Sequence, residues 1–192
     1  MAIDAALEAR IHKALAECED EARSSVMTKH FGNRGPTHQE CSESVGVDSH
    51  GRHMTRAMQL GIEQHDEALQ CAQEKLQELK PDGFSISPRY HLDFRTGKVQ
   101  YLSPDQVKAQ LDSGRSAELR GSLEPDIVIH TGSPLQIQRV FDFKFPCVND
   151  GRPAWREYPR GHPHQDLTQK QAYESVLKAR AFRVIPRWGV LE

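Results

Sequence analysis

The sequence predicts a protein of the α/β class. Two long amphipathic patterns predict helices at residues 3–27 and 55–79, and two short apolar runs predict strands at residues 125–130 and 135–145. The chain has 192 residues, of which 37% are hydrophobic and 27% charged, so it is long enough for one ordinary globular domain. No apolar run approaches the roughly 20 residues that a membrane span requires, and we expect no membrane-spanning segment.

Residues 1–52 are expected to form an N-terminal helix and an irregular connection. Within residues 3–27, apolar side chains recur at helical spacing, namely Leu7, Ile11, Ala14, Cys18 and Ala22. Residues 28–52 are rich in Gly, Ser, Thr, Asn and His and show little periodicity, which is typical of a loop. The N-terminus lacks a basic stretch followed by an apolar one, so no signal peptide and a cytoplasmic site of action are expected.

Residues 53–192 are expected to form the main domain. The helix at 55–79 has the strongest apolar stripe of the chain: Met58, Ile62, His65, Leu69, Ala72, Leu76 and Leu79. Strands at 84–92 and 99–102 predict a hairpin, and Ser103 before Pro104 predicts the start of a short helix to about residue 111. After the strands at 125–130 and 135–145, the sequence predicts a helix at 167–179 and a strand at 182–190 that Pro186 interrupts.

The four cysteines are scattered and show no spacing typical of zinc or iron–sulfur ligation: Cys18, Cys41, Cys71 and Cys147. We interpret them as free thiols of a reducing compartment.

The strand at residues 141–145 carries the residues that suggest chemistry. Its period of two places three phenylalanines on one face and Asp142 with Lys144 on the other. Charges beside such an apolar face need a partner or a metal ion. Asp126, at the start of the neighbouring strand, is in phase with Val128 and could converge on Asp142.

Two carboxylates and a lysine suit phosphodiester hydrolysis. Carboxylates can hold a divalent cation that polarises the phosphoryl oxygen, and an ammonium group can stabilise the developing negative charge. The alternative is purely structural: an ion pair between Asp142 and Lys144 at a strand edge, with Asp126 in a turn.

Four motifs, in order along the chain, resemble those of the PD-(D/E)xK, or restriction-endonuclease-like, nucleases. Pro125-Asp126 is followed after fifteen residues by Asp142-Phe143-Lys144. Upstream, residues 61–65 resemble the G-x-x-x-H helix motif of the RecB-like members, and downstream, residues 169–173 resemble their Q-x-x-x-Y motif. The resemblance covers about residues 61–190.

The resemblance implies a restriction-endonuclease-like core, a mixed β-sheet flanked by α-helices, with residues 1–52 as an N-terminal helical extension. It implies Mg²⁺ or Mn²⁺ as cofactor and no iron–sulfur cluster, since no three cysteines follow Tyr173. The roles that it implies are metal ligation by His65, Asp126, Asp142 and the Phe143 carbonyl, catalysis by Lys144, and substrate contact by Gln169 and Tyr173. Glu63, on the other side of its helix, ranks below His65.

Charge suggests where a phosphate-bearing substrate would bind. Residues 151–192 carry eight Lys or Arg against four Asp or Glu, whereas the whole chain has a net charge of −2. A solvated mixed face would explain the same charges. The candidates for contacts with the nucleic-acid backbone are Arg152, Arg156, Arg160 and Lys170.

The expected substrate is nucleic acid, DNA rather than RNA. The chain also resembles the nuclease toxin domains of bacterial polymorphic toxins and secretion-system effectors, which implies delivery into a target cell and an immunity protein as partner. A phage or mobile-element repair exonuclease is the alternative setting.

Two other classes of function stay open. One is a catalytically inactive module that binds nucleic acid or protein. The other is a zinc-binding module or zinc enzyme that uses residues from a scattered set: His30, His38, Cys41, His50, His53, His162 and His164.

Overall fold

A computed structural model describes residues 2–32, 34–48 and 51–192 of the chain. Its helices are α1 (Ala5–Phe31), α2 (His38–Ser42), α3 (Arg56–Leu79), α4 (Pro104–Asp112), a 3-10 turn at Ser116–Leu119 and α5 (Gln169–Leu177). Its strands are β1 (Ser44–Val47), β2 (His53–Thr55), β3 (Phe84–Ile86), β4 (Arg89–Asp93), β5 (Lys98–Leu102), β6 (Ile127–His130), β7 (Ile137–Phe143), β8 (Arg180–Ile185) and β9 (Gly189–Leu191). The α/β class is confirmed.

The central sheet has five strands in the order β3-β6-β7-β8-β9. Only β7 and β8 run parallel, and α5 makes the crossover between them, so the sheet is mixed. In the antiparallel pair β6 and β7, Ile127 lies opposite Phe141. Continuing this register by one residue brings Asp126 opposite Asp142.

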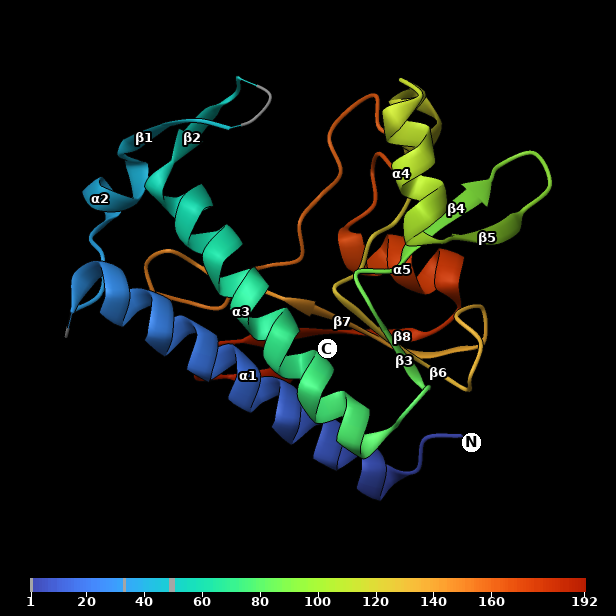
Figure 1. The fold of residues 1–192 in the computed structure, drawn as a ribbon, viewed down its shortest axis with the longest axis horizontal. Helices are drawn as coiled ribbons and strands as arrows, with labels where there is room; N and C mark the ends of the chain where they lie inside the picture. Colours follow the sequence, from blue (N-terminus) through green and yellow to red (C-terminus); the bar gives the residue numbers. More distant parts are fainter. Residues whose placement is uncertain (1, 33, 49–50) are drawn as a thin grey trace.

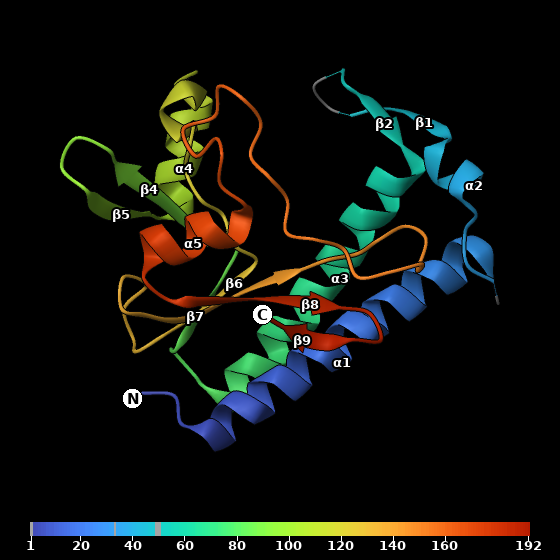
Figure 2. The same cartoon turned by 180° about the vertical axis from the view of Figure 1, so that it is seen from behind.

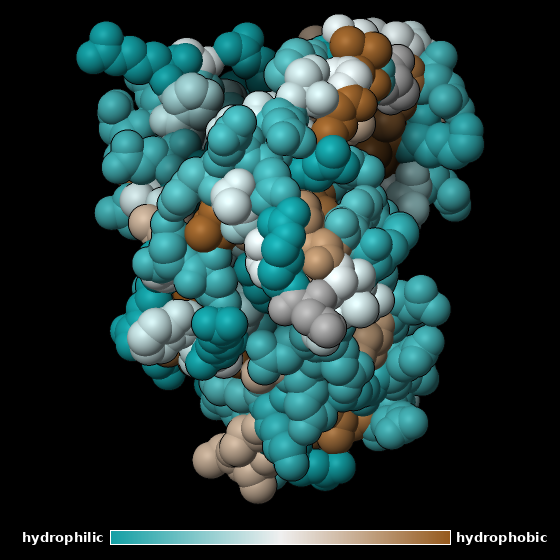
Figure 3. All heavy atoms as spheres, turned by 90° about the vertical axis from the view of Figure 1, so that its left-hand side faces the viewer, coloured by the Kyte–Doolittle hydropathy of each residue, from teal (hydrophilic) through white to brown (hydrophobic). Residues whose placement is uncertain are grey.

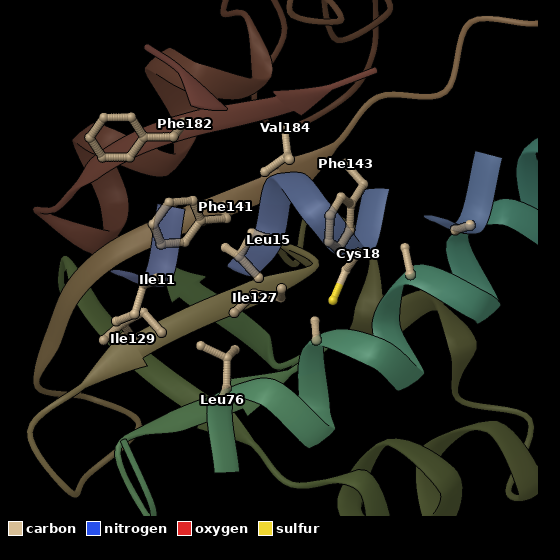
Figure 4. Packing of buried hydrophobic residues seen from close by; sticks show 13 residues of the cluster. Ile11, Leu15, Cys18, Leu76, Ile127, Ile129, Phe141, Phe143, Phe182 and Val184 are labelled. Carbon is tan, nitrogen blue, oxygen red and sulfur yellow. The ribbon is translucent and has the colours of Figure 1, made fainter. Parts of the chain in front are cut away.

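Helices cover both faces of this sheet (Figures 1 and 2). The helices α1 and α3 pack against one face, where Phe141 and Phe143 meet Leu15 and Leu76 (Figure 4). Helix α5 and the β4–β5 hairpin cover the other face around Val128, Val140, Tyr90 and Tyr173. The alternation along β7 therefore has the expected result, since its phenylalanines are buried on one face while Asp142 projects from the other.

Helix α1 belongs to the core and is not an appendage to it. Ile11, Leu15 and Cys18 are fully buried in the same hydrophobic cluster as Ile127 and Phe141. The expectation of an N-terminal extension is therefore wrong for this helix. Residues 28–52, expected to be irregular, contain α2 and β1, and β1 forms a small hairpin with β2. These elements are too short for sequence periodicity to show.

Two predicted strands are divided in the structure. The strand expected at 84–92 breaks at Ser87, which has a positive φ and precedes Pro88, so β3 joins the central sheet and β4 pairs with β5. The strand expected at 182–190 is a hairpin of β8 and β9 that turns after Pro186. Ser103 caps α4 as predicted and forms a capping box with Gln106.

The stripe predicted for α3 is buried only in part. Met58 and Ile62 are exposed, while Leu60 and Gln64 are buried in the same turns. This end of α3 extends past the sheet toward α2 and the β1–β2 hairpin (Figure 1), so the sheet no longer determines which side is buried.

All four cysteines form disulfides, which overturns their interpretation as free thiols. Cys18 of α1 bonds to Cys71 of α3, and Cys41 of α2 bonds to Cys147 in the segment after β7. The partners are 53 and 106 residues apart in sequence. Sequence spacing cannot reveal such pairs because the fold alone brings them together. Disulfides persist in oxidising surroundings, so the cysteines no longer argue for a reducing compartment.

The end of the molecule formed by α2 and the β1–β2 hairpin presents a mostly hydrophilic surface (Figure 3). None of the helices in the described part of the chain combines the length and the apolar character needed to cross a membrane.

Candidate active site

The two acidic residues meet at one end of the antiparallel pair β6 and β7. Asp126 immediately precedes β6, and Asp142 is the penultimate residue of β7. The Asp126 carboxylate accepts a hydrogen bond of 2.7 Å from the backbone N–H of Phe143, which fixes its side chain on the neighbouring strand. The sheet register therefore brings two carboxylates together although sixteen positions separate them in the sequence.

Asp142 is held by a network of polar side chains. Its Oδ2 is paired with the Lys144 ammonium, and its Oδ1 accepts a hydrogen bond of 3.2 Å from the Tyr173 hydroxyl. Gln169 connects the two partners, since its Oε1 accepts from Lys144 at 2.7 Å and its Nε2 donates to Tyr173 at 3.1 Å. Thr168 caps α5 and so fixes the helix that carries Gln169 and Tyr173.

His65 approaches the acids from α3. Its Nδ1 lies 3.4 Å from Oδ2 of Asp126, and its ring makes edge contacts with Phe143 and Phe145. Burial lowers the pKa of His65, so the imidazole is neutral at neutral pH, as a metal ligand must be. Burial and then the charge of Asp142 raise the pKa of Asp126 well above its usual range.

These side chains line a cavity of about 340 Å³. The predicted residues in its wall are His65, Asp126, Asp142, Phe143, Lys144, Arg156 and Gln169. A larger cavity of about 540 Å³, beside the C-terminal half of α1, contains only one carboxylate residue, Asp20. The smaller cavity is therefore the candidate active site.

Three predicted residues have other partners. Glu63 faces α1, where it accepts hydrogen bonds from Lys29 at 2.8 Å and shares one of 2.9 Å with His30. The bond with Lys29 helps to lower the pKa of Glu63 to about 2. Arg152 stacks on the Trp188 ring at 3.8 Å, and Lys170 pairs with Glu174 at 2.7 Å.

Two residues beside the acids were not predicted from the sequence. Glu124 lines the cavity and pairs with Arg89, and its position directly before Pro125-Asp126 was an available signal. Trp155 lies in the connection between β7 and α5, with the Lys144 Nζ 5.3 Å from the centre of its ring. A single tryptophan in a Pro- and Arg-rich segment gave no sign of this contact.

The donor set has the chemistry of a site for a hard divalent cation. Two carboxylates with a neutral imidazole beside them suit Mg²⁺ or Mn²⁺. A cation would offset both the burial and the Asp142 charge that raise the pKa of Asp126. As the side chains stand, no three His, Cys, Asp or Glu side chains within the described residues converge closely enough to enclose a metal ion. Here Lys144 and Tyr173 hold the Asp142 carboxylate.

The residues of the zinc alternative are dispersed. Cys41 is in a disulfide, His30 contacts Glu63, and His38 lies 3.1 Å from Asp150. The His164 Nε2 is 2.9 Å from the Gly121 carbonyl oxygen. His50 lies outside the described residues, and His53 is exposed on β2.

Comparisons of the chain with protein-family models, with curated proteins and with solved structures gave no match.

Proposed function

We propose that this protein is a divalent-metal-dependent nuclease with a restriction-endonuclease-like core, and that it hydrolyses phosphodiester bonds of nucleic acid, DNA rather than RNA. The observation that carries the proposal is the meeting of Asp126, Asp142 and Lys144 in one cavity at the end of β6 and β7. The mixed sheet with helices on both faces supports the proposed core.

In this proposal Asp126, Asp142 and the His65 imidazole hold Mg²⁺ or Mn²⁺, with the Phe143 carbonyl beside them. When bound, the cation polarises a phosphoryl oxygen and lowers the pKa of a water molecule. Lys144 places its ammonium next to the acids, where it stabilises the negative charge that develops on the phosphorus-bound oxygens.

The surrounding residues position these groups. Gln169 orients Lys144 through its 2.7 Å hydrogen bond, and Tyr173 orients Asp142. Arg156 lines the cavity with an exposed guanidinium and is the candidate for a contact with a substrate phosphate. Arg160, exposed four residues later, would extend that contact along the strand.

Cleavage of supercoiled plasmid tests the proposal. We expect nicking or degradation with Mg²⁺ or Mn²⁺, none with EDTA, and none with folded Asp142→Ala or Lys144→Ala protein. Matched controls are Glu17→Ala and Lys75→Ala, which break an exposed ion pair between α1 and α3 and should leave cleavage intact. Absence of metal-dependent cleavage of both DNA and RNA by the wild-type protein would refute the proposal.

As a biological setting we propose a bacterial toxin or effector domain with an immunity protein as partner. Two disulfides suit a domain that passes through an oxidising environment on its way to a target cell. Intracellular expression of wild-type and Asp142→Ala protein in bacteria tests this setting. Equal growth of the two strains would count against it.

A further inference from the structure

A group of aromatic rings lies beside the cavity and has no role in the proposed hydrolysis. Tyr158 and His162 stack in parallel, with ring centres 4.4 Å apart and an interplanar angle of 9°. The buried His164 ring lies 5.6 Å from both of them, and the Phe94 ring lies 5.5 Å from His164. We call Phe94, Tyr158 and His162, with His164 beneath them, the aromatic ridge.

The ridge is continuous with the candidate active site. Pro153 and Arg156, in the segment that leads to Tyr158, line the cavity. Between them, the Trp155 ring contacts the Lys144 ammonium and the edge of Tyr173. In both views of the fold, the connection from β7 to α5 runs from the central sheet up beside α4 (Figures 1 and 2).

Phe94, at the end of the ridge away from the cavity, is exposed and is not needed for the hydrophobic core. Phe94 is 57% exposed in the turn of the β4–β5 hairpin. This turn is already stabilised by Asp93, whose carboxylate accepts hydrogen bonds from Arg95 and Thr96, so the phenyl ring is not needed to form it. An exposed aromatic ring beside other rings is a stacking surface.

Positive charge accompanies the ridge. Residues 152–163 contain Arg152, Arg156 and Arg160 against the single acid Glu157. Arg95 follows Phe94, and Arg120 donates a hydrogen bond of 2.6 Å to the Gly161 carbonyl next to His162. None of these five arginines forms an ion pair with an acid of the described chain segments, and Arg152 stacks on the Trp188 ring.

We propose that the aromatic ridge binds single-stranded nucleic acid and guides it into the cavity, an inference that rests on the proposed nuclease function. Unpaired bases would stack on Phe94 and on the Tyr158–His162 pair, while the arginines that form no ion pair would contact phosphates. Stacking requires exposed base faces, which a duplex hides between its base pairs. The ridge therefore favours a single strand, or the unpaired end of a duplex, over an intact duplex.

Fluorescence anisotropy in EDTA tests binding separately from cleavage. The probes are oligodeoxyuridylate and oligouridylate of about 12 nucleotides, which share the base and differ in the sugar, and a DNA duplex of equal length; this length is within the site size of such surfaces. We expect tighter binding of a single strand than of the duplex, and for Phe94→Ala a loss of single-strand affinity of about fivefold or more, with duplex affinity unchanged. Phe94→Trp should restore the affinity.

The matched control is Leu135→Ala. Leu135 is 54% exposed and lies in the turn between β6 and β7, at the opposite end of these strands from the cavity. This variant should bind all three probes as the wild-type protein does. Either sugar bound through Phe94 supports the ridge, and the preferred sugar identifies the substrate.

Duplex binding as tight as single-strand binding, or unchanged single-strand binding by Phe94→Ala, would overturn the inference. Its failure is separable from that of the nuclease proposal. Single-strand binding through Phe94 without any cleavage would support the ridge and remove the nuclease, whereas metal-dependent cleavage without this binding would do the reverse.

Discussion

Two regions of the molecule bury carboxyl groups, and they treat them in opposite ways. In the cavity, Asp142 is only 4% exposed, but Lys144 and Tyr173 contact its two oxygens. In α1, Glu19 is fully buried, and neither of its oxygens has a hydrogen-bond partner among the described residues. Burial and then the charge of Asp20 raise the pKa of Glu19 to about 9, so this group is neutral at neutral pH.

The difference shows that burial alone does not identify a functional acid. A carboxyl group in a closed core avoids the cost of its charge by keeping its proton, as Glu19 does. A group that is to hold a cation needs an open side and partners that stabilise its charged form. Asp126 and Asp142 have the cavity, and Asp142 has the adjacent ammonium group. Variants of the two regions should therefore respond differently in activity and in stability.

The largest expected effect is that of Asp126→Asn on cleavage. The amide keeps the acceptor for the Phe143 N–H but loses the charge that would hold the cation, so cleavage should fall about a thousandfold or more. Without metal, the same variant should be more stable than the wild type. Burial and then the charge of Asp142 raise the pKa of Asp126 in the folded protein. The folded wild type therefore loses stability relative to the unfolded chain as pH rises above the unfolded pKa of 3.8.

Plasmid cleavage and thermal unfolding in EDTA measure the two halves of this prediction. We expect a rise in Tm of about 2 °C or more at neutral pH, and the gap should close as pH falls below the unfolded value of 3.8, where the wild-type group keeps its proton in both states. A lower Tm for the variant would mean that the Asp126 charge stabilises the fold and does not serve a cation.

The cavity illustrates how far the sequence could lead. Period-two alternation was enough to place Asp142 and Lys144 away from the phenylalanine face, and the position of Asp126 at the start of the neighbouring strand suggested that it meets Asp142. The exact register could not be predicted, because it shifts between Ile129 and His130. The contact of Glu63 with Lys29 depends on how α1 packs, and the contact of Trp155 with Lys144 depends on how the connection between β7 and α5 packs. Such packing has no local signal, and the same holds for the disulfide pairs and for the burial of Glu19.

One disulfide lies next to the buried Glu19 of α1 and the other next to the cavity, so their removal tests the stability of the two regions separately. Cys18 precedes Glu19, and Cys147 follows the cavity wall at Pro146. The disulfides close loops of 53 and 106 residues and so restrict the unfolded chain. Substituting both cysteines of either disulfide with alanine should therefore lower the free energy of unfolding by about 4 kcal/mol.

Only the pair Cys41→Ala and Cys147→Ala should also reduce cleavage, since it releases the segment that follows Lys144. Arg23 holds that segment as well, by a hydrogen bond of 2.7 Å to the Pro146 carbonyl. Urea unfolding and plasmid cleavage, with and without dithiothreitol, measure these effects. A wild-type unfolding midpoint that does not respond to the reductant would contradict the prediction.

A smaller effect is expected from Glu19→Gln. The pKa of Glu19 is raised from 4.5 to about 9, so its contribution to stability is full below 4.5 and is lost as pH rises toward 9. Between about pH 5 and about pH 7 the wild type should lose about 3 kcal/mol from this group, and the variant should not. Urea unfolding at both pH values measures the difference, and cleavage should be unaffected. If the free energies of unfolding of the two proteins changed equally with pH, Glu19 would not have the raised pKa on which the comparison depends.

The smallest effect, and the most specific, concerns two buried tyrosines of the same hydrophobic cluster. Tyr173 donates to Asp142, whereas Tyr90 donates a hydrogen bond of 2.8 Å to the Pro134 carbonyl, away from the cavity. Each Tyr→Phe substitution keeps the ring. Tyr90→Phe removes one hydrogen bond and should cost about 1 kcal/mol of stability, whereas Tyr173→Phe removes those with Asp142 and Gln169 and should cost about 2 kcal/mol. Only Tyr173→Phe should also lower cleavage, by about tenfold, because it frees the Asp142 carboxylate to turn. Urea unfolding and cleavage rates of both variants make the test, and an equal loss of cleavage by Tyr90→Phe would assign the effect to the fold and not to the orientation of Asp142.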